Sequence, residues 1–154
     1  MASLGKTSIT RLRTCHVALR AIVKEAIKVY DFSVVYGQRD IKTQLELFKK
    51  GRRLVNDRWI IIDKSKIVTN CDGYKIKSKH NAEPLSLAID LAPYDTASKK
   101  ILWDNEKAFY ELAGVIKTVA YNLNVAIKWG GNFRSLKDLP HYELIDDDTK
   151  WNLL

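Results

Sequence analysis

Two histidines and two aspartates occupy positions from which they could bind a metal and activate water. His80 is followed ten residues later by Asp90, within the alternating segment 85–91. Side chains of a strand alternate between its two faces, so Asp90 shares one face with Ser86 and Ala88. These small neighbours leave room beside the carboxylate for a metal or a ligand.

The second pair of chemically capable residues lies near the end of the chain. Asp138 precedes His141 by three residues, in a turn that leads into a short predicted strand. In that strand Tyr142 and Leu144 are expected to face the core, while His141 and Glu143 point the other way. The sequence thus offers two histidines with carboxylates close to each.

Two histidines and one carboxylate are typical of a catalytic zinc site that keeps a fourth position for water. Zinc lowers the pKa of that water toward ~7. A carboxylate outside the metal's ligand set, such as Asp138, can accept the water proton and pass it to the leaving amine. Spacing alone leaves simpler readings open, in which the histidines are surface or packing residues, Asp90 caps a turn and Asp138 forms an Asx-turn.

The elements that must position these residues follow an α+β pattern. Helices are predicted from apolar periodicity over residues 8–30, 40–50 and 105–123, with Gly51 closing the second. Short strands are predicted over residues 32–36, 59–62, 66–69, 85–91, 125–129 and 141–144. We expect a small antiparallel sheet flanked by helices, with the metal site on one face of the sheet.

Composition bounds the class of protein. The chain has 154 residues, 46% of them hydrophobic and 29% charged, which is typical of a globular chain, and we expect one domain over residues 1–154. The net charge of +8 favours a polyanionic partner, whether nucleic acid, anionic lipid or an acidic wall polymer. Cys15 and Cys71 show no metal-binding or disulfide spacing, so both are expected to be reduced and inert. Residues 1–14 contain no apolar run typical of a secretory signal.

Several motifs resemble the VanY-type zinc peptidase family, which includes D-Ala-D-Ala carboxypeptidases, dipeptidases and phage L-alanyl-D-glutamate endolysins. The resemblance spans residues 32–144. The motifs are Gly37-Gln38-Arg39 with Gln44, Ser78-Lys79-His80, Ala88-Ile89-Asp90, Trp129-Gly130-Gly131-Asn132-Phe133 and Asp138-Leu139-Pro140-His141. Nine residues separate His80 from Asp90, where six are common in the family, so the loop before the strand is longer here.

The resemblance implies a role for each matching residue. Asp138 becomes the catalytic base, and Arg39 the group that steadies the polarised carbonyl oxygen of the substrate. The ligands of one zinc ion per chain are then His80, Asp90 and His141. Residues that bind substrate or support the site are then Ser78, Gln44 and Trp129. A turn cap and a helix-surface residue remain alternatives for the first two of these.

The function that this resemblance implies is that of a monomeric phage endolysin cutting the L-Ala–D-Glu bond of the peptidoglycan stem peptide. Such a lysin would be stored in the host cytoplasm until lysis and drawn by its basic surface to the anionic wall or outer membrane. No separate wall-binding domain is expected.

Other readings stay open. A D-Ala-D-Ala carboxypeptidase or dipeptidase would use the same site. A basic nucleic-acid-binding module is a further alternative, although the sequence contains no helix-turn-helix, zinc-finger or RNP-like signature. The acidic run 146–148 is either a cation site or a solvated turn.

Overall fold

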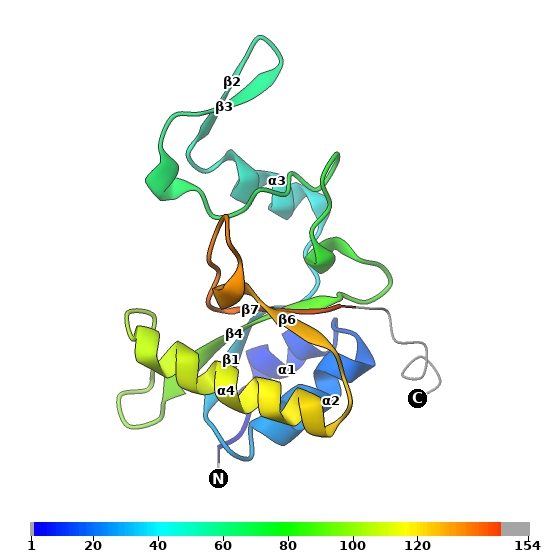
Figure 1. Ribbon diagram of the computed structural model, residues 1–154, viewed down its shortest axis with the longest axis vertical. Helices are drawn as coiled ribbons and strands as arrows, with labels where there is room; N and C mark the ends of the chain where they lie inside the picture. Colours follow the sequence, from blue (N-terminus) through cyan, green and yellow to red (C-terminus); the bar gives the residue numbers. More distant parts are fainter. Residues whose placement is uncertain (1, 146–154) are drawn as a thin grey trace.

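The computed structural model describes residues 2–145 and confirms the α+β fold (Figure 1). The helices are α1 (Lys6–Leu12), α2 (Val17–Ala26), α3 (Ile41–Lys49) and α4 (Glu106–Asn122), with 3-10 turns η1 (Lys64–Lys66), η2 (Lys79–Asn81) and η3 (Gly130–Asn132). The strands are β1 (Phe32–Tyr36), β2 (Arg52–Val55), β3 (Arg58–Ile61), β4 (Ala88–Asp95), β5 (Lys100–Ile101), β6 (Ile127–Trp129) and β7 (His141–Leu144). The acidic run 146–148 lies outside the described residues.

The main sheet is antiparallel and has the order β1-β4-β7-β6, with β5 paired to the end of β4. Strand β4 is central, with β1 on one side and β7 on the other. Asp90 of β4 lies directly opposite His141 of β7. Because cross-strand partners share a face of the sheet, this register brings the predicted ligands together.

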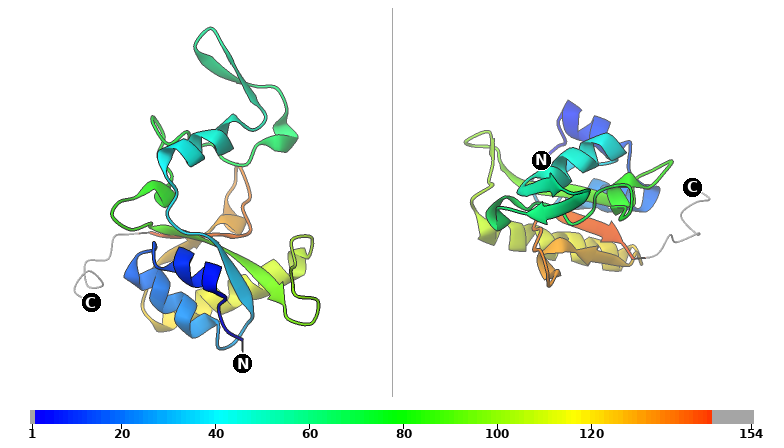
Figure 2. Two further views of the ribbon diagram at one scale, coloured as in Figure 1. Left: turned by 180° about the vertical axis from the view of Figure 1, so that it is seen from behind. Right: turned by 90° about the horizontal axis from the view of Figure 1, so that it is seen from above.

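Helices α1, α2 and α4 cover one face of the main sheet, and α3 with the β2–β3 hairpin lies beyond the other face (Figures 1 and 2). The alternation predicted for β4 and β7 is confirmed, since Ile89, Leu91, Tyr142 and Leu144 belong to the hydrophobic core. Burial of such side chains is the main stabilising contribution to the fold. The opposite face of β4 and β7 carries Asp90 and His141 and is free to form a site.

The single helix predicted over residues 8–30 is wrong: the chain forms α1 and α2 with a break between them. At the break Cys15 forms an isolated parallel bridge with Ser86. Ser86 N donates to the carbonyl oxygen of Thr14 at 2.9 Å, and Ser86 O accepts from His16 N at 2.9 Å. This pairing with a distant segment outweighs the local helical pattern, and the His16 side chain then caps α2.

The strand predictions also need correction in several places. The strand predicted over 66–69 is not formed, because the end of η1 and irregular backbone occupy those residues. Strand β4 begins at Ala88 rather than at residue 85. Strands β2 and β5 were not predicted. Strand β2 pairs with β3 through a two-residue turn at Asn56 and Asp57, whose φ angles are 47° and 59°.

Among residues 2–145, no helix combines the length and apolar character needed to cross a bilayer.

Candidate metal centre

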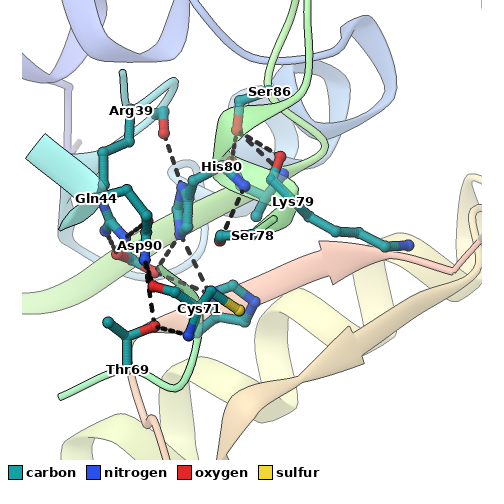
Figure 3. Close-up of polar contacts among 12 residues, drawn as sticks. Arg39, Gln44, Thr69, Cys71, Ser78, Lys79, His80, Ser86 and Asp90 are labelled. Carbon is teal, nitrogen blue, oxygen red and sulfur yellow. Dashed lines mark hydrogen bonds and ion pairs between the residues drawn. The ribbon is translucent and has the colours of Figure 1, made fainter. Parts of the chain in front are cut away.

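Three side chains from distant parts of the chain converge on the open face of the sheet. Two of them, His80 and Asp90, are labelled in Figure 3. His80 Nε2 lies 3.1 Å from Asp90 Oδ1 and 3.2 Å from His141 Nδ1. His141 Nδ1 lies 3.3 Å from the same Asp90 oxygen. All three residues are buried. The structure therefore brings together the three residues that the sequence singled out as metal ligands.

The spacing of these three atoms matches a tetrahedral metal site. Bonds of about 2.0–2.1 Å from a tetrahedral zinc ion place its ligand atoms about 3.3–3.4 Å apart. The observed separations of 3.1, 3.2 and 3.3 Å are close to that value. The donor set of two imidazoles and one carboxylate is also one that binds zinc with a position left for water.

Hydrogen bonds on the far side of each ring determine which histidine nitrogen faces the centre. His80 Nδ1 lies 2.8 Å from the backbone oxygen of Gly37, and His141 Nε2 lies 2.9 Å from Glu143 Oε2. A neutral imidazole has one N–H donor and one lone pair. If each ring donates to its outer partner, both lone pairs point at Asp90. Three electron-pair donors then face one another, an arrangement that a cation satisfies.

The local charges compensate one another when no cation is present. Burial opposes a charge on His141, but hydrogen bonds to Asp90 and Glu143 outweigh it and raise its pKa to about 9. Burial also opposes the charge on Asp90, yet the neighbouring His80 and His141 hold the pKa of that carboxyl well below its usual range. A bound metal would take the place of the proton on His141.

The backbone of η2 is fixed by a reciprocal cap. Ser78 Oγ accepts from His80 N at 3.2 Å, and Ser78 N donates to Asn81 Oδ1 at 2.9 Å. Asn81 Nδ2 in turn donates to the backbone oxygen of Arg39 at 2.8 Å. Ser78 thus takes the turn-cap position that the sequence had left as one of its alternatives, and it orients His80.

Arg39 and Gln44 lie beside the candidate metal centre, on the side of α3 (Figure 3). Arg39 Nη2 donates to Asp90 Oδ2 at 3.3 Å, and Arg39 Nη1 donates to Gln44 Oε1 at 3.0 Å. Gln44 is fully buried and donates through Nε2 to the backbone oxygen of Cys71 at 2.8 Å. The guanidinium therefore holds one Asp90 oxygen, which leaves the other directed at the histidines.

Asp138 and Arg39 line the same cleft as the three candidate ligands, a space of about 450 Å³. Burial raises the pKa of Asp138, and the charge of Asp90 raises it further, against the opposing effect of His141. The Asp138 backbone is bound on both sides, since its N–H donates to Gly130 O at 3.0 Å and its oxygen accepts from His141 N at 3.1 Å.

Gly130 allows the segment that carries Asp138 and His141 to pack closely against the backbone at residue 130. A Cβ atom at Gly130 would lie 2.3 Å from the backbone oxygen of Asp138 and 2.9 Å from His141 Cβ. Any side chain at this position would displace the segment that carries Asp138 and His141. The first glycine of the motif 129–133, Gly130, is thus explained by the close approach of the Asp138 backbone.

Trp129 lies in the core, with 4% of its surface exposed, and is not among the described residues that line the cleft. Its Nε1 donates to the backbone oxygen of Leu139 at 2.8 Å, which fixes the chain just before His141. Phe133 instead lines the cleft, with its ring centroid 5.6 Å from that of His141. Sequence reasoning singled out Phe133 only as part of a motif.

The fold and the site together define an α+β protein with a candidate His–Asp–His metal centre in a cleft on the sheet face. The chain belongs to the phage L-alanyl-D-glutamate peptidase family, whose sequence profile matches residues 1–149.

Two individual proteins are similar to the chain. The peptidoglycan L-alanyl-D-glutamate endopeptidase CwlK of Bacillus subtilis is 32% identical over 128 residues, which cover 78% of this chain but 64% of CwlK. The crystal structure of the Serratia marcescens L-Ala D-Glu endopeptidase ChiX superposes with a TM-score of 0.69 over 96% of this chain and 94% of that one. At 20% identity, the likeness to ChiX shows the shared fold.

Proposed function

We propose that this chain is a zinc-dependent peptidoglycan peptidase that hydrolyses the L-Ala–D-Glu bond of the stem peptide. The observation that carries this proposal is the convergence of His80, Asp90 and His141 in one cleft with Asp138. Membership of the family and the activity named for CwlK support the choice of bond. We further propose a phage endolysin, acting as a monomer on the wall after release from the host cytoplasm.

The side chains of the cleft divide the chemistry among them. A zinc ion held by His80, Asp90 and His141 would polarise the scissile carbonyl and lower the pKa of water toward ~7. Asp138 accepts the proton of the attacking water and returns it to the leaving amine.

Arg39 has two roles in the proposed mechanism. Its bond to Asp90 Oδ2 keeps the carboxylate in a fixed orientation toward the histidines. Because Arg39 also lines the cleft, its positive charge stabilises the negative charge that develops on the carbonyl oxygen of the substrate. Gln44 accepts a hydrogen bond from the guanidinium and so keeps it in place for both roles.

Product analysis on a soluble muropeptide with an intact stem tests this proposal. The purified chain is expected to release a peptide that begins with D-Glu and to leave L-Ala on the muramic acid. Chelation should stop the reaction and added zinc should restore it, whereas His80→Ala should show neither activity nor recovery. Release of terminal D-Ala, or full activity after exhaustive chelation, would contradict the proposal.

A further inference from the structure

Residues 49–68, which we call the hairpin arm, extend away from the sheet. The β2–β3 turn lies at the far end of this arm. The arm projects in both the front and the rear view (Figures 1 and 2). It exposes a series of large aliphatic side chains to solvent. Their exposed fractions are 51% for Leu54, 41% for Ile60, 52% for Ile61 and 60% for Ile62. These side chains lie along the hairpin, from Leu54 near the turn to Ile62 at its base, where Ile62 N donates to Gly51 O. Exposed apolar side chains gathered in one projecting segment are a feature that normally has a partner.

The hairpin arm also carries most of the net charge of the protein. It contains seven cationic side chains and two carboxylates, so its net charge is +5 out of +8 for the whole chain. The cations are Lys49, Lys50, Arg52, Arg53, Arg58, Lys64 and Lys66. Positive charge and exposed aliphatic surface therefore occupy the same short segment.

One face of the hairpin is fixed to α3. The Arg52 guanidinium lies 4.0 Å from the Phe48 ring centroid and donates to the backbone oxygens of Phe48 and Thr69. The Trp59 ring meets the edge of Phe48, with centroids 5.9 Å apart. These contacts hold the base of the arm in a defined orientation.

The other face alternates cationic and aliphatic side chains. Arg53 lies directly opposite Ile60, and Val55 lies directly opposite Arg58. Cross-strand partners share a face, so two arginines and two aliphatic residues form one surface. Arg53, Arg58 and Ile60 are exposed, and Val55 is half-buried.

We propose that the hairpin arm binds the surface of an anionic lipid bilayer. Ile60 and Ile62 enter the boundary between head groups and acyl chains, and Arg53 and Arg58 pair with lipid phosphates. An anionic bilayer attracts each nearby cation and accepts apolar side chains at its interface. A hydrophilic polyanion such as a wall polymer or nucleic acid would satisfy the arginines but would leave the isoleucines in water.

This inference goes beyond the proposed peptidase activity, because lipid binding needs no hydrolysis. Of the described arm residues, Val68 alone lines the cleft. Binding through Ile60, Ile62, Arg53 and Arg58 therefore leaves the catalytic residues in place. The arm would keep the cleft close to the bilayer, where the adjoining layer of wall begins.

Co-sedimentation with lipid vesicles tests the proposal on the full chain. The protein is expected to bind vesicles that contain phosphatidylglycerol much more tightly than vesicles of phosphatidylcholine alone. The double variant Ile60→Thr/Ile62→Thr should weaken binding about tenfold through lost apolar contact. The double variant Arg53→Gln/Arg58→Gln should weaken it about thirtyfold, at ~1 kcal/mol per cation.

Matched substitutions elsewhere provide the controls. Val29 is 70% exposed, and Lys24 and Lys107 are exposed cations away from the arm. Val29→Thr and Lys24→Gln/Lys107→Gln should bind vesicles as the unchanged protein does. All variants should cleave the soluble muropeptide at the original rate, which shows that the cleft is intact. If the muropeptide is not cleaved by any form, the peptidase proposal fails while vesicle binding still decides this one.

Two results would overturn the proposal. One is the absence of binding to phosphatidylglycerol vesicles. The other is full vesicle binding by Ile60→Thr/Ile62→Thr together with loss in Arg53→Gln/Arg58→Gln, which would make the arm a charge-only site for a hydrophilic polyanion.

Discussion

The two candidate histidine ligands are oriented by different partners, a backbone carbonyl for His80 and a carboxylate for His141. The alternation of β7 predicted that His141 and Glu143 share a face of the strand. It did not predict the hydrogen bond between their side chains. The Gly37 carbonyl could not be predicted, because backbone oxygens carry no sequence signal. At this scale the sequence therefore predicted which side chains meet, and left out the contacts that determine their tautomers.

Glu143 offers a direct test of this orientation. Glu143→Ala removes the acceptor for His141 Nε2, so the ring loses the bond that directs Nδ1 to the centre. Loss of such a partner typically lowers metal affinity about 10- to 100-fold. Zinc affinity can be measured by competition with a coloured chelator, with the exposed Glu46→Ala as the control. Equal affinities for the two variants would show that Glu143 does not support the site.

The two roles of Arg39, orienting Asp90 and stabilising the substrate's carbonyl oxygen, can be tested separately. Arg39→Lys keeps a positive charge but cannot hold Gln44 and Asp90 at once, because the planar fork of donors is lost. We expect zinc affinity to fall about tenfold, along with turnover. If turnover falls while zinc affinity stays unchanged, Arg39 acts on the substrate alone and does not orient Asp90.

Elements that depend on distant contacts are the hardest to predict from the sequence. The break between α1 and α2 arises because residues 14–16 pair with Ser86, which lies some seventy positions away. The β2–β3 hairpin does have a local signal, the Asn56-Asp57 pair that favours a two-residue turn with positive φ. Strands β1 and β7 were predicted with their observed bounds, because each is a short alternating segment whose neighbours are turns.

The connection between β6 and β7 can be tested by substitution of Gly130. Gly130→Ala should push the Asp138 backbone away, because the new Cβ would lie 2.3 Å from its oxygen. A misplacement of about 1 Å can reduce turnover about 100-fold. Turnover, zinc content and thermal unfolding should be measured together, and the fold is expected to persist.

Gly114 provides the matched control for this substitution. It lies in α4, and an added Cβ would meet nothing within 4 Å. Gly114→Ala should leave turnover unchanged and stabilise the fold by about 0.5–1 kcal/mol. Equal turnover in the two alanine variants would contradict the role given to Gly130.

The net charge of the whole molecule should affect its binding to intact walls more than its rate of peptide-bond hydrolysis. With a net charge of +8, attraction to an anionic wall or membrane weakens as salt shortens the screening length from ~10 Å at 0.1 M to ~3 Å at 1 M. Lysis of intact walls should therefore fall steeply with salt, while cleavage of a soluble stem peptide should fall much less. Parallel salt responses for both substrates would show that the basic surface has no part in wall binding.

The central claim is that three side chains bind the metal while Asp138 moves the proton, and Asp138→Asn tests it most directly. The amide keeps the shape of the side chain but cannot accept a proton. Zinc content and turnover should be measured on the same sample. We expect about one zinc per chain and a turnover reduced about 100- to 10,000-fold, roughly 3 to 5 kcal/mol of barrier. Near-native turnover at neutral pH with zinc bound would contradict it.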